Sequence, residues 1–279
     1  MDQFIPIPAL HLFQKLNDLL IELLCSLSPE DWNRYTLAKQ WTVKDVAAHL
    51  LDINMRTISS AEGYNTPPDR EINSYQDLVD YLNSLNATWV NAMKRVSPAQ
   101  ITGLLENTHQ KYLDYHASLD PLAPAKYSVA WAGETLSLNW FHIAREYTEK
   151  WHHQQQIREA TGKTEPLMSR ELFYPCIDTF MQGLPHTYRN VEAEPGSIIR
   201  VTISGEAGGD WYLTKSNEKW VLGKSRQGDK ITASVAIDPG IAWKLFTKGT
   251  DPGTAIQTAI MQGDKTLATQ ALYMISVIA

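Results

Sequence analysis

From about Ala9 to Gly162, apolar side chains recur at the three- and four-residue spacing of amphipathic helices, and short segments rich in Pro, Gly, Ser and Asp interrupt the pattern. Because residues three or four apart share one face of a helix, the pattern predicts helices that pack through apolar stripes. The predicted helices cover residues 9–27, residues 42 to a loop at 63–73, and residues 74–96, 98–118 and 136–160. Substantial helices joined by loops predict a four-helix bundle.

The helix predicted from Thr42 has the clearest start signal. Asp45 stands three residues after Thr42, an acidic variant of the capping box. The apolar stripe that follows comprises Val43, Val46, Ala47, Leu50 and Ile53. We therefore expect this helix to bury one face from its first turn.

The pattern changes after Pro166. One more helix is predicted over residues 169–188, with an interruption at Pro175. Segments rich in β-branched and aromatic residues then predict strands over 197–203, 211–213, 220–222 and 231–237, the middle two joined as a hairpin around 216–218, and helical patterns return at 241–248 and from 264 to the end. The fold class is thus two domains, an all-α bundle over residues 1–165 and an α+β domain over 166–279.

Charge and composition limit the classes of partner and the cellular locations that we expect for this protein. The chain of 279 residues has a net charge of −6 and a sequence pI of about 5.8, which disfavours a nucleic-acid partner. No apolar run approaches the ~18 residues of a membrane span, and the first residues lack the pattern of a secretory signal. We expect a cytoplasmic protein, with Cys25 and Cys176 as free, buried thiols.

Familiar catalytic motifs are missing from the sequence. It has no P-loop, GxGxxG, GxSxG or HExxH pattern, which disfavours nucleotide-binding, serine-hydrolase and thermolysin-type functions. Five tryptophans are expected in the core rather than on a nucleic-acid stacking surface: Trp41, Trp89, Trp131, Trp140 and Trp151.

The helix over 136–160 carries one polar stripe through about four turns. The stripe consists of His142, Glu146, Glu149, His153 and Gln156. Imidazole, carboxylate and amide groups are the side chains that bind metals or move protons, whereas a solvated stripe usually mixes Lys, Arg and Glu. The opposite stripe is apolar, so we expect one contact face and one face that lines a polar cavity.

Within this stripe, Glu149 and His153 are four residues apart and can hold a single cation. His49, at the edge of the apolar stripe of an earlier helix, is the best third ligand. A set of two histidines and one glutamate leaves a fourth position open, as in catalytic zinc sites, with Ni²⁺, Fe²⁺ or Mn²⁺ as alternatives to Zn²⁺. From spacing alone, a surface Glu–His pair and a hydrogen-bonded His49 at the core edge are the competing interpretations.

Two segments carry a family resemblance. WTVKDVAAHL (41–50) and REYTEKWHHQQQIREATG (145–162) resemble the signature regions of the DinB-like metal-binding superfamily, in particular its mycothiol-dependent maleylpyruvate isomerase branch. The resemblance implies that His49, Glu149 and His153 are the first, second and third metal ligands. The wider superfamily commonly has His at the second position, and this chain retains its His152-His153 and Gln156 pattern beside the carboxylate.

The second half resembles the sterol-carrier-like partner domain of those isomerases, through ASVAIDPGIAWKLFTKG (233–249) and QGDKTLATQAL (262–272). The family mechanism that this implies is a divalent-metal-dependent enzyme, in which a low-molecular-weight thiol (mycothiol, bacillithiol or glutathione) is bound as thiolate and attacks an electrophilic alkene. Addition, rotation and elimination would make it an isomerase; retention of the adduct or displacement of a leaving group would make it a transferase. The alternative is a non-enzymatic metal- or apolar-ligand-binding protein. A monomer and a homodimer are both consistent with the sequence.

Further residues could contact the substrate or the metal ligands. Arg145 could pair with a substrate carboxylate or form a surface salt bridge, and Gln156 could hydrogen-bond a ligand or substrate. His142 and Glu146 are expected to support or wall the site rather than ligate. His109 and His116 share a helix face that we expect to be half-exposed, with a role near the cavity as the alternative.

Overall fold

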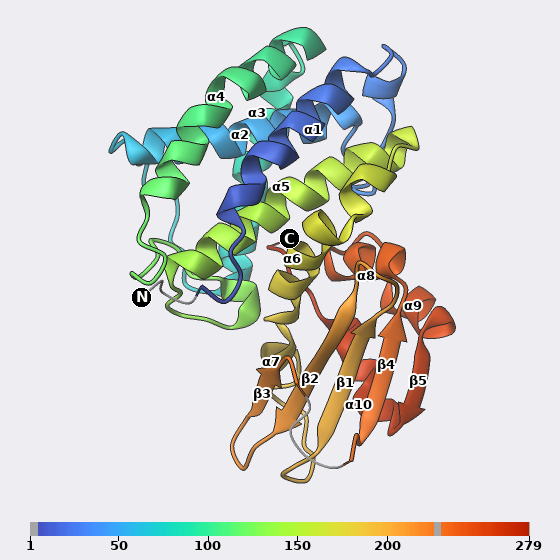
Figure 1. The fold of residues 1–279 in the computed structure, drawn as a ribbon. Helices are drawn as coiled ribbons and strands as arrows, with labels where there is room; N and C mark the ends of the chain where they lie inside the picture. The colour runs from blue at the N-terminus through green and yellow to red at the C-terminus, as the bar shows by residue number, and fades with distance from the viewer. Residues whose placement is uncertain (1–4, 226–229, 279) are drawn as a thin grey trace. The chain divides into compact units, whose positions relative to one another are not determined.

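The computed structural model describes residues 5–225 and 230–278, and within them the chain forms two compact units (Figure 1). The first unit is helical and comprises the described residues of Met1–Pro124, Leu138–Leu167 and Ile278–Ala279. The second comprises Ala125–Ser137 and Met168–Val277 and contains a five-stranded sheet. A helical N-terminal region followed by a sheet domain agrees with the predicted class, while the boundary between residues 165 and 166 stays a prediction.

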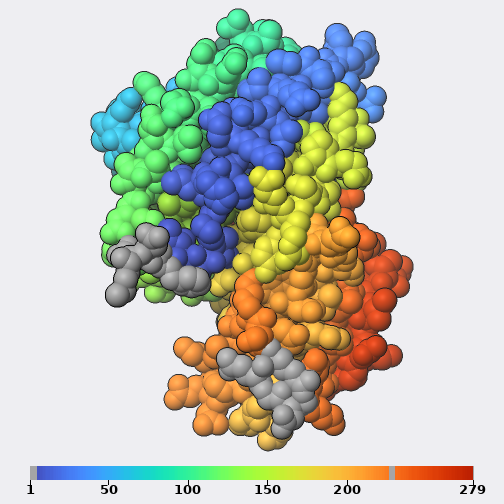
Figure 2. All heavy atoms as spheres, in the orientation of Figure 1, coloured from blue at the N-terminus to red at the C-terminus, as the bar shows by residue number. Residues whose placement is uncertain are grey.

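Five long helices make up most of the first unit. They are α1 (Phe13–Cys25), α2 (Val43–Ala61), α3 (Tyr75–Met93), α4 (Pro98–Ser118) and α5 (Asn139–Thr161), with short 3₁₀ turns η1 (Leu10–Leu12), η2 (Asp31–Asn33) and η4 (Glu165–Met168). α2 packs against α3, α4 and α5, and α1 packs against α4 and α5. Figure 2 shows α1 in blue beside α4 in green on one face of this unit.

The capping box at the start of α2 is confirmed. Thr42 Oγ1 accepts a hydrogen bond from the Asp45 backbone N–H at 3.3 Å, and Asp45 Oδ2 accepts one from the Thr42 N–H at 3.0 Å. These bonds satisfy two N–H groups that the first turn leaves without helical partners. α2 is buried from its first residue, Val43, and His49 follows at 5% exposure.

α5 differs from its prediction in two respects. It begins at Asn139 rather than near Leu136, because Leu138 is extended and bridges Pro124, while the Asn139 N–H bonds to Ala123 O at 3.0 Å. It is also buried around its circumference, as consecutive buried residues show, instead of having one apolar and one polar face. Polar side chains on every side of α5 must therefore find partners inside the protein.

The second unit is built on a mixed sheet. Its strands are β1 (Ile198–Ile203), β2 (Gly209–Lys215), β3 (Trp220–Gly223), β4 (Ala233–Ile237) and β5 (Ile260–Gly263), in the order β3-β2-β1-β4-β5. β1 and β4 are parallel, with Val201 opposite Val235, and the other pairs are antiparallel. Its helical segments are α6 (Arg170–Met181), α7 (Leu184–Thr187), α8 (Pro239–Phe246), α9 (Pro252–Thr258) and α10 (Lys265–Gln270), with 3₁₀ turns η3 (Ala130–Ala132) and η5 (Ala271–Tyr273).

The predicted hairpin is present as β2 and β3, but other predictions for this unit were wrong. Pro175 lies inside α6 and does not interrupt it; the break comes at Gly183. The sequence pattern did not predict α9 or β5. The residues of β5 are mostly exposed and do not alternate between buried and exposed positions. The helix predicted from Asp264 to the end of the chain stops at Gln270. The chain beyond it is not helical, and the backbone N–H of Ser276 bonds to Phe246 O at 2.9 Å. The last residue of this prediction, Ala279, lies outside the described residues.

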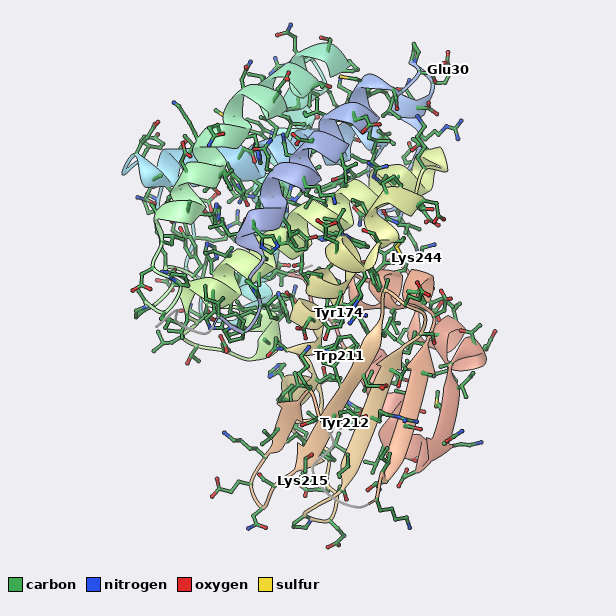
Figure 3. The ribbon with its side chains drawn as sticks, viewed as in Figure 1. Glu30, Tyr174, Trp211, Tyr212, Lys215 and Lys244 are labelled. Atoms are coloured by element: carbon green, nitrogen blue, oxygen red, sulfur yellow. The ribbon has the colours of Figure 1, made fainter. Side chains whose placement is uncertain are left out.

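A cluster joins α6 to the sheet, with Trp211 and Asp178 buried, Tyr174 half-buried and Lys224 exposed. The rings of Tyr174 on α6 and Trp211 on β2, both labelled in Figure 3, lie close together. They stack with centroids 5.7 Å apart. Trp211 Nε1 donates a hydrogen bond to Asp178 Oδ1 at 2.8 Å, and Lys224 forms an ion pair with the same carboxylate. Lys224 Nζ also lies 5.0 Å and 4.9 Å from the two ring centroids, within cation–π range.

Three further predictions have mixed outcomes. Both cysteines are free, but Cys25, the last residue of α1, is exposed, and only Cys176 is buried. Of the tryptophans expected in the core, Trp131 and Trp151 are buried, whereas Trp41, Trp89 and Trp140 are half-buried. Within residues 5–225 and 230–278, no helix combines the length and the hydropathy that crossing a membrane requires.

Candidate metal centre

The structure brings His49, Glu149 and His153 together. His49 comes from the middle of α2, and the other two come from successive turns of α5. One ligand atom of each, an imidazole nitrogen or a carboxylate oxygen, lies within 4.8 Å of the others. This is the one such group of His, Cys, Asp and Glu side chains among the described residues. Side chains 100 residues apart in the sequence meet because α2 and α5 pack against each other.

The three side chains are tightly arranged. The rings of His49 and His153 meet edge to face with centroids 4.6 Å apart, and His153 Nε2 lies 3.5 Å from Glu149 Oε2. Trp41 lies against both rings, with centroid distances of 5.0 Å to His49 and 6.4 Å to His153. Both histidines are buried, and Glu149 keeps about a fifth of its side chain exposed.

Gln156 sets the orientation of the His153 ring. Its Oε1 lies 2.9 Å from His153 Nδ1, three residues away along α5. Because an amide oxygen can only accept, Nδ1 carries the proton and Nε2 is the nitrogen directed toward Glu149. Without a cation, Nε2 and the carboxylate would present lone pairs to each other at 3.5 Å. A proton or a metal ion therefore belongs between them.

The protonation states suit a metal. Burial lowers the pKa of His49 well below its ordinary value of 6.5, and the nearby His153 lowers it further, so this imidazole is neutral at pH 7. Burial acts to raise the pKa of Glu149, but the hydrogen bond with His153 and the electrostatic interactions with His152, His153 and Arg145 outweigh it. The net pKa of Glu149 is lowered, and its carboxylate is ionised at neutral pH.

The residues present fit a zinc-like ion. Two ligands of a tetrahedral zinc ion lie roughly 3.3 Å apart, given Zn–N and Zn–O distances of about 2.0–2.2 Å. The 3.5 Å between His153 Nε2 and Glu149 Oε2 is close to that separation. In addition, Nδ1 of buried His49 has no hydrogen-bond partner in the described part of the chain. Two imidazoles and one carboxylate are the donor set of His₂Glu zinc sites.

His152 points elsewhere. Its Nδ1 lies 2.8 Å from Thr148 O, and it is not part of the group formed by His49, Glu149 and His153. Consecutive helix residues point about 100° apart, which accounts for the separate roles of His152 and His153. Burial lowers the pKa of His152 to about 4, with a further lowering from His153.

The other half of the polar stripe forms a network one to two turns before Glu149. Arg145 Nη2 donates to Glu146 Oε1 at 2.7 Å and lies 2.8 Å from His142 Nδ1, while Tyr112 of α4 donates to Glu146 Oε2 at 3.0 Å. Burial acts to raise the pKa of Glu146, but Arg145, His142 and the Tyr112 hydroxyl hold it at about 2. Arg145 is largely buried in this pair, so its salt bridge is not on the surface.

The structure also shows residues that the sequence analysis misjudged or passed over. His109 and His116 are 7% and 0% exposed rather than half-exposed. Lys150, next to Glu149, extends between the helices and donates to Leu50 O at 3.0 Å and Asn54 Oδ1 at 2.5 Å. Burial lowers the pKa of Lys150 to about 7, against the opposing effect of Glu146 and Glu149. A lysine in a helix sequence carries no signal of such burial, because most lysines are exposed.

Comparison with known protein families identifies the family of this chain. Residues 13–158 of the 279 match the family model described as the mycothiol maleylpyruvate isomerase N-terminal domain. The chain belongs to this family. The matched segment contains His49, Glu149, His153 and Gln156, and it agrees with the resemblance seen in the sequence.

Solved structures show that the fold of the chain, across both units, is also similar to that of a known enzyme. The chain is similar to two crystal structures of a mycothiol-dependent maleylpyruvate isomerase. The TM-score is 0.53 for a mutant of that enzyme and 0.50 for the other structure, whose description names no mutation. In each case the identity is 10%, and the likeness covers 90% of this chain and 93% of the other. At this identity the comparison shows a shared fold. No curated protein sequence matches the chain.

Proposed function

We propose that this protein is a zinc-dependent enzyme that uses a low-molecular-weight thiol to isomerise a small electrophilic substrate of the maleylpyruvate kind. The observation that carries the proposal is the convergence of His49, Glu149 and His153 to within 4.8 Å. Membership of the mycothiol maleylpyruvate isomerase N-terminal domain family supports the thiol chemistry. Transfer of the thiol to the electrophile is the related reaction that the same residues would serve.

Zinc, when bound, would stabilise a coordinated thiol as its thiolate and so supply the nucleophile. The residues of the chain contribute the protonation states and the orientation of the ligands. Neutral His49 and ionised Glu149 are ready to bind a cation without first losing a proton. Gln156 keeps the donor nitrogen of His153 directed at the site, and Trp41 covers the two imidazole rings. His49, Glu149 and His153 would hold the ion, which could then also accept the thiol sulfur as a ligand.

Several finer expectations belong to the same proposal. Mycothiol is the first thiol to test because of the family, with bacillithiol and glutathione next. We further propose a cytoplasmic monomer or homodimer that acts on small molecules, without nucleic-acid or membrane partners. A four-helix bundle and a sterol-carrier-like second domain are the fold types that we assign to the two units.

Metal analysis of the purified full-length protein tests the centre first. We expect about one zinc ion per chain, lost in His49→Ala and His153→Ala with the helical circular dichroism retained. His11→Ala, an exposed histidine on η1, is the matched control and should keep the ion. Cis–trans isomerisation of maleylpyruvate, followed by ultraviolet absorbance, should then require both zinc and thiol.

The outcomes separate the two functions that the sequence left open. Thiol-dependent turnover that falls more than 100-fold in His153→Ala supports the enzyme. Zinc bound at these residues, without turnover of maleylpyruvate or other electrophiles with any of the thiols, overturns it in favour of a binding protein. Absence of bound metal in the wild-type protein after zinc loading overturns the whole proposal.

A further inference from the structure

The two imidazoles of the candidate centre are oriented in different ways. On α5, Gln156 Oε1 lies 2.9 Å from Nδ1 of His153 and fixes that ring. On α2, no hydrogen bond to the His49 ring is seen among the described residues, and its Nδ1 is fully buried without a partner there. Histidines that bind metal almost always have a second group that sets the orientation of the ring. Some contact other than a hydrogen bond must therefore orient His49.

The indole of Trp41 supplies that contact. Its ring centroid lies 5.0 Å from that of His49, with the two planes tilted by 49°. The same indole lies 6.4 Å from the ring of His153, with an angle of 31° between the planes. The two imidazoles meet edge to face, 4.6 Å apart, so the three rings form one aromatic cluster. Trp41 is half-buried, so part of its indole packs on this cluster and the rest meets solvent.

The backbone around Trp41 is held in place. Its carbonyl oxygen accepts hydrogen bonds from the Thr36 N–H at 2.9 Å and from Thr36 Oγ1 at 3.0 Å. Its own N–H donates to Ala38 O at 2.7 Å, and the next residue, Thr42, caps α2. A tryptophan side chain has two rotatable bonds, each restricted to a few rotamers, so a fixed backbone leaves the indole few orientations. Trp41 can therefore act as a rigid support for the rings that it contacts.

A second tryptophan of the helical unit offers a comparison. Trp140, in the first turn of α5, is also half-buried. It stacks on Phe141 with centroids 5.1 Å apart, rather than on a residue of the candidate centre. Removing either indole takes away a similar amount of packing, but only the Trp41 indole is in contact with His49 and His153.

We propose that Trp41 is the positioning residue of His49. Its indole holds the imidazole beside His153 and Glu149 by packing, where many other metal-binding histidines use a hydrogen-bond acceptor. This inference rests on the proposed function, because it assigns Trp41 a role in the proposed zinc centre. Trp41 acts through the ligands, so its replacement should change how tightly an ion is held and in what geometry, while the helices stay folded.

Two variants at this position separate ring contact from apolar bulk. Trp41→Leu keeps an apolar side chain but loses the flat ring, whereas Trp41→Phe keeps a flat ring. Competition with a chromophoric chelator should show a zinc affinity about tenfold lower in Trp41→Leu, and within about threefold of the wild-type protein in Trp41→Phe. Trp140→Leu is the matched control and should keep the wild-type affinity. A loss in Trp140→Leu as large as that in Trp41→Leu, or no loss in Trp41→Leu, overturns the inference.

Cobalt in place of zinc tests the geometry, because the visible absorption bands of bound Co²⁺ depend on the arrangement of its ligands. These bands should change in Trp41→Leu and return in Trp41→Phe, with the helical circular dichroism of both full-length variants unchanged. Wild-type cobalt bands in Trp41→Leu overturn the positioning role and leave the centre itself in place. Failure of the wild-type protein to bind zinc or cobalt instead overturns the proposed function, and the role of Trp41 with it.

Discussion

Oε1 of Gln156 lies 2.9 Å from Nδ1 of His153, and this contact decides which nitrogen of the histidine faces Glu149. Both residues are on α5, three positions apart, and both are buried. The helix itself therefore supplies the ligand and the group that orients it. Partners of this kind raise the basicity of a ligating imidazole and restrict its rotation.

Replacing Gln156 tests this positioning role. Gln156→Leu should lower zinc affinity about 10- to 100-fold, because the ring loses the acceptor that fixes its tautomer. Gln156→Glu keeps an acceptor for Nδ1 and should restore most of the affinity. Competition with a chromophoric chelator measures both. Equal zinc affinity in Gln156→Leu and the wild-type protein would remove Gln156 from the centre.

Glu149 tests which donors the site accepts. Glu149→His should still bind one zinc ion within about tenfold of the wild-type affinity, because imidazole is an ordinary zinc ligand at a similar distance. Glu149→Leu, of similar size but without a donor, should lose more than 100-fold. The same chelator competition applies, with circular dichroism to check the fold. Zinc affinity that is indifferent to Glu149→Leu would show that the ion binds elsewhere.

The capping box of α2 predicts a stability effect. Thr42→Ala removes the side-chain oxygen that accepts from the Asp45 N–H and should cost about 1 kcal/mol of unfolding free energy. Thr88→Ala in α3 is the matched control, since Thr88 is exposed and, within the described part of the chain, its side chain bonds only to Ser84 O of the same helix. Denaturant unfolding of both variants gives the comparison. A loss in Thr88→Ala as large as that in Thr42→Ala would contradict the cap's contribution.

Sequence patterns correctly predict those features that depend on contacts between residues close together in the chain. Thr42 and Asp45 predict a cap because both partners lie within one turn, and Glu149 and His153 share a face because the helix period brings them together. By contrast, β5 is held by backbone pairing to β4, as between Met261 and Val235, and its side chains carry no alternating pattern. Long-range pairing of this kind is invisible to a local pattern.

Burial of polar residues was the other limit of sequence reasoning. The imidazole, carboxylate and amide groups of the stripe on α5 predict one apolar contact face and one face that lines a polar cavity. Once α2 and α4 enclose the helix, Glu146 is satisfied by Tyr112 and Arg145, and Lys150 by Leu50 O and Asn54. Apart from the neighbouring Arg145, these partners come from α2 and α4, which lie far from α5 in the sequence. Only the packed structure reveals them.

His142 should make stability depend on pH. Burial first, with Arg145 and His116, lowers its pKa from 6.5 to about 4 against the pull of Glu146. Between these values the unfolded chain binds a proton that the folded protein does not, so stability is present above pH 6.5 and falls toward pH 4. From pH 7 to 5 this amounts to about 2 kcal/mol. His142→Asn keeps an acceptor for Arg145 but does not titrate. Between pH 7 and 5, the free energy of urea unfolding should therefore fall by about 2 kcal/mol less in this variant than in the wild-type protein. Parallel pH curves for the two proteins would contradict the assignment.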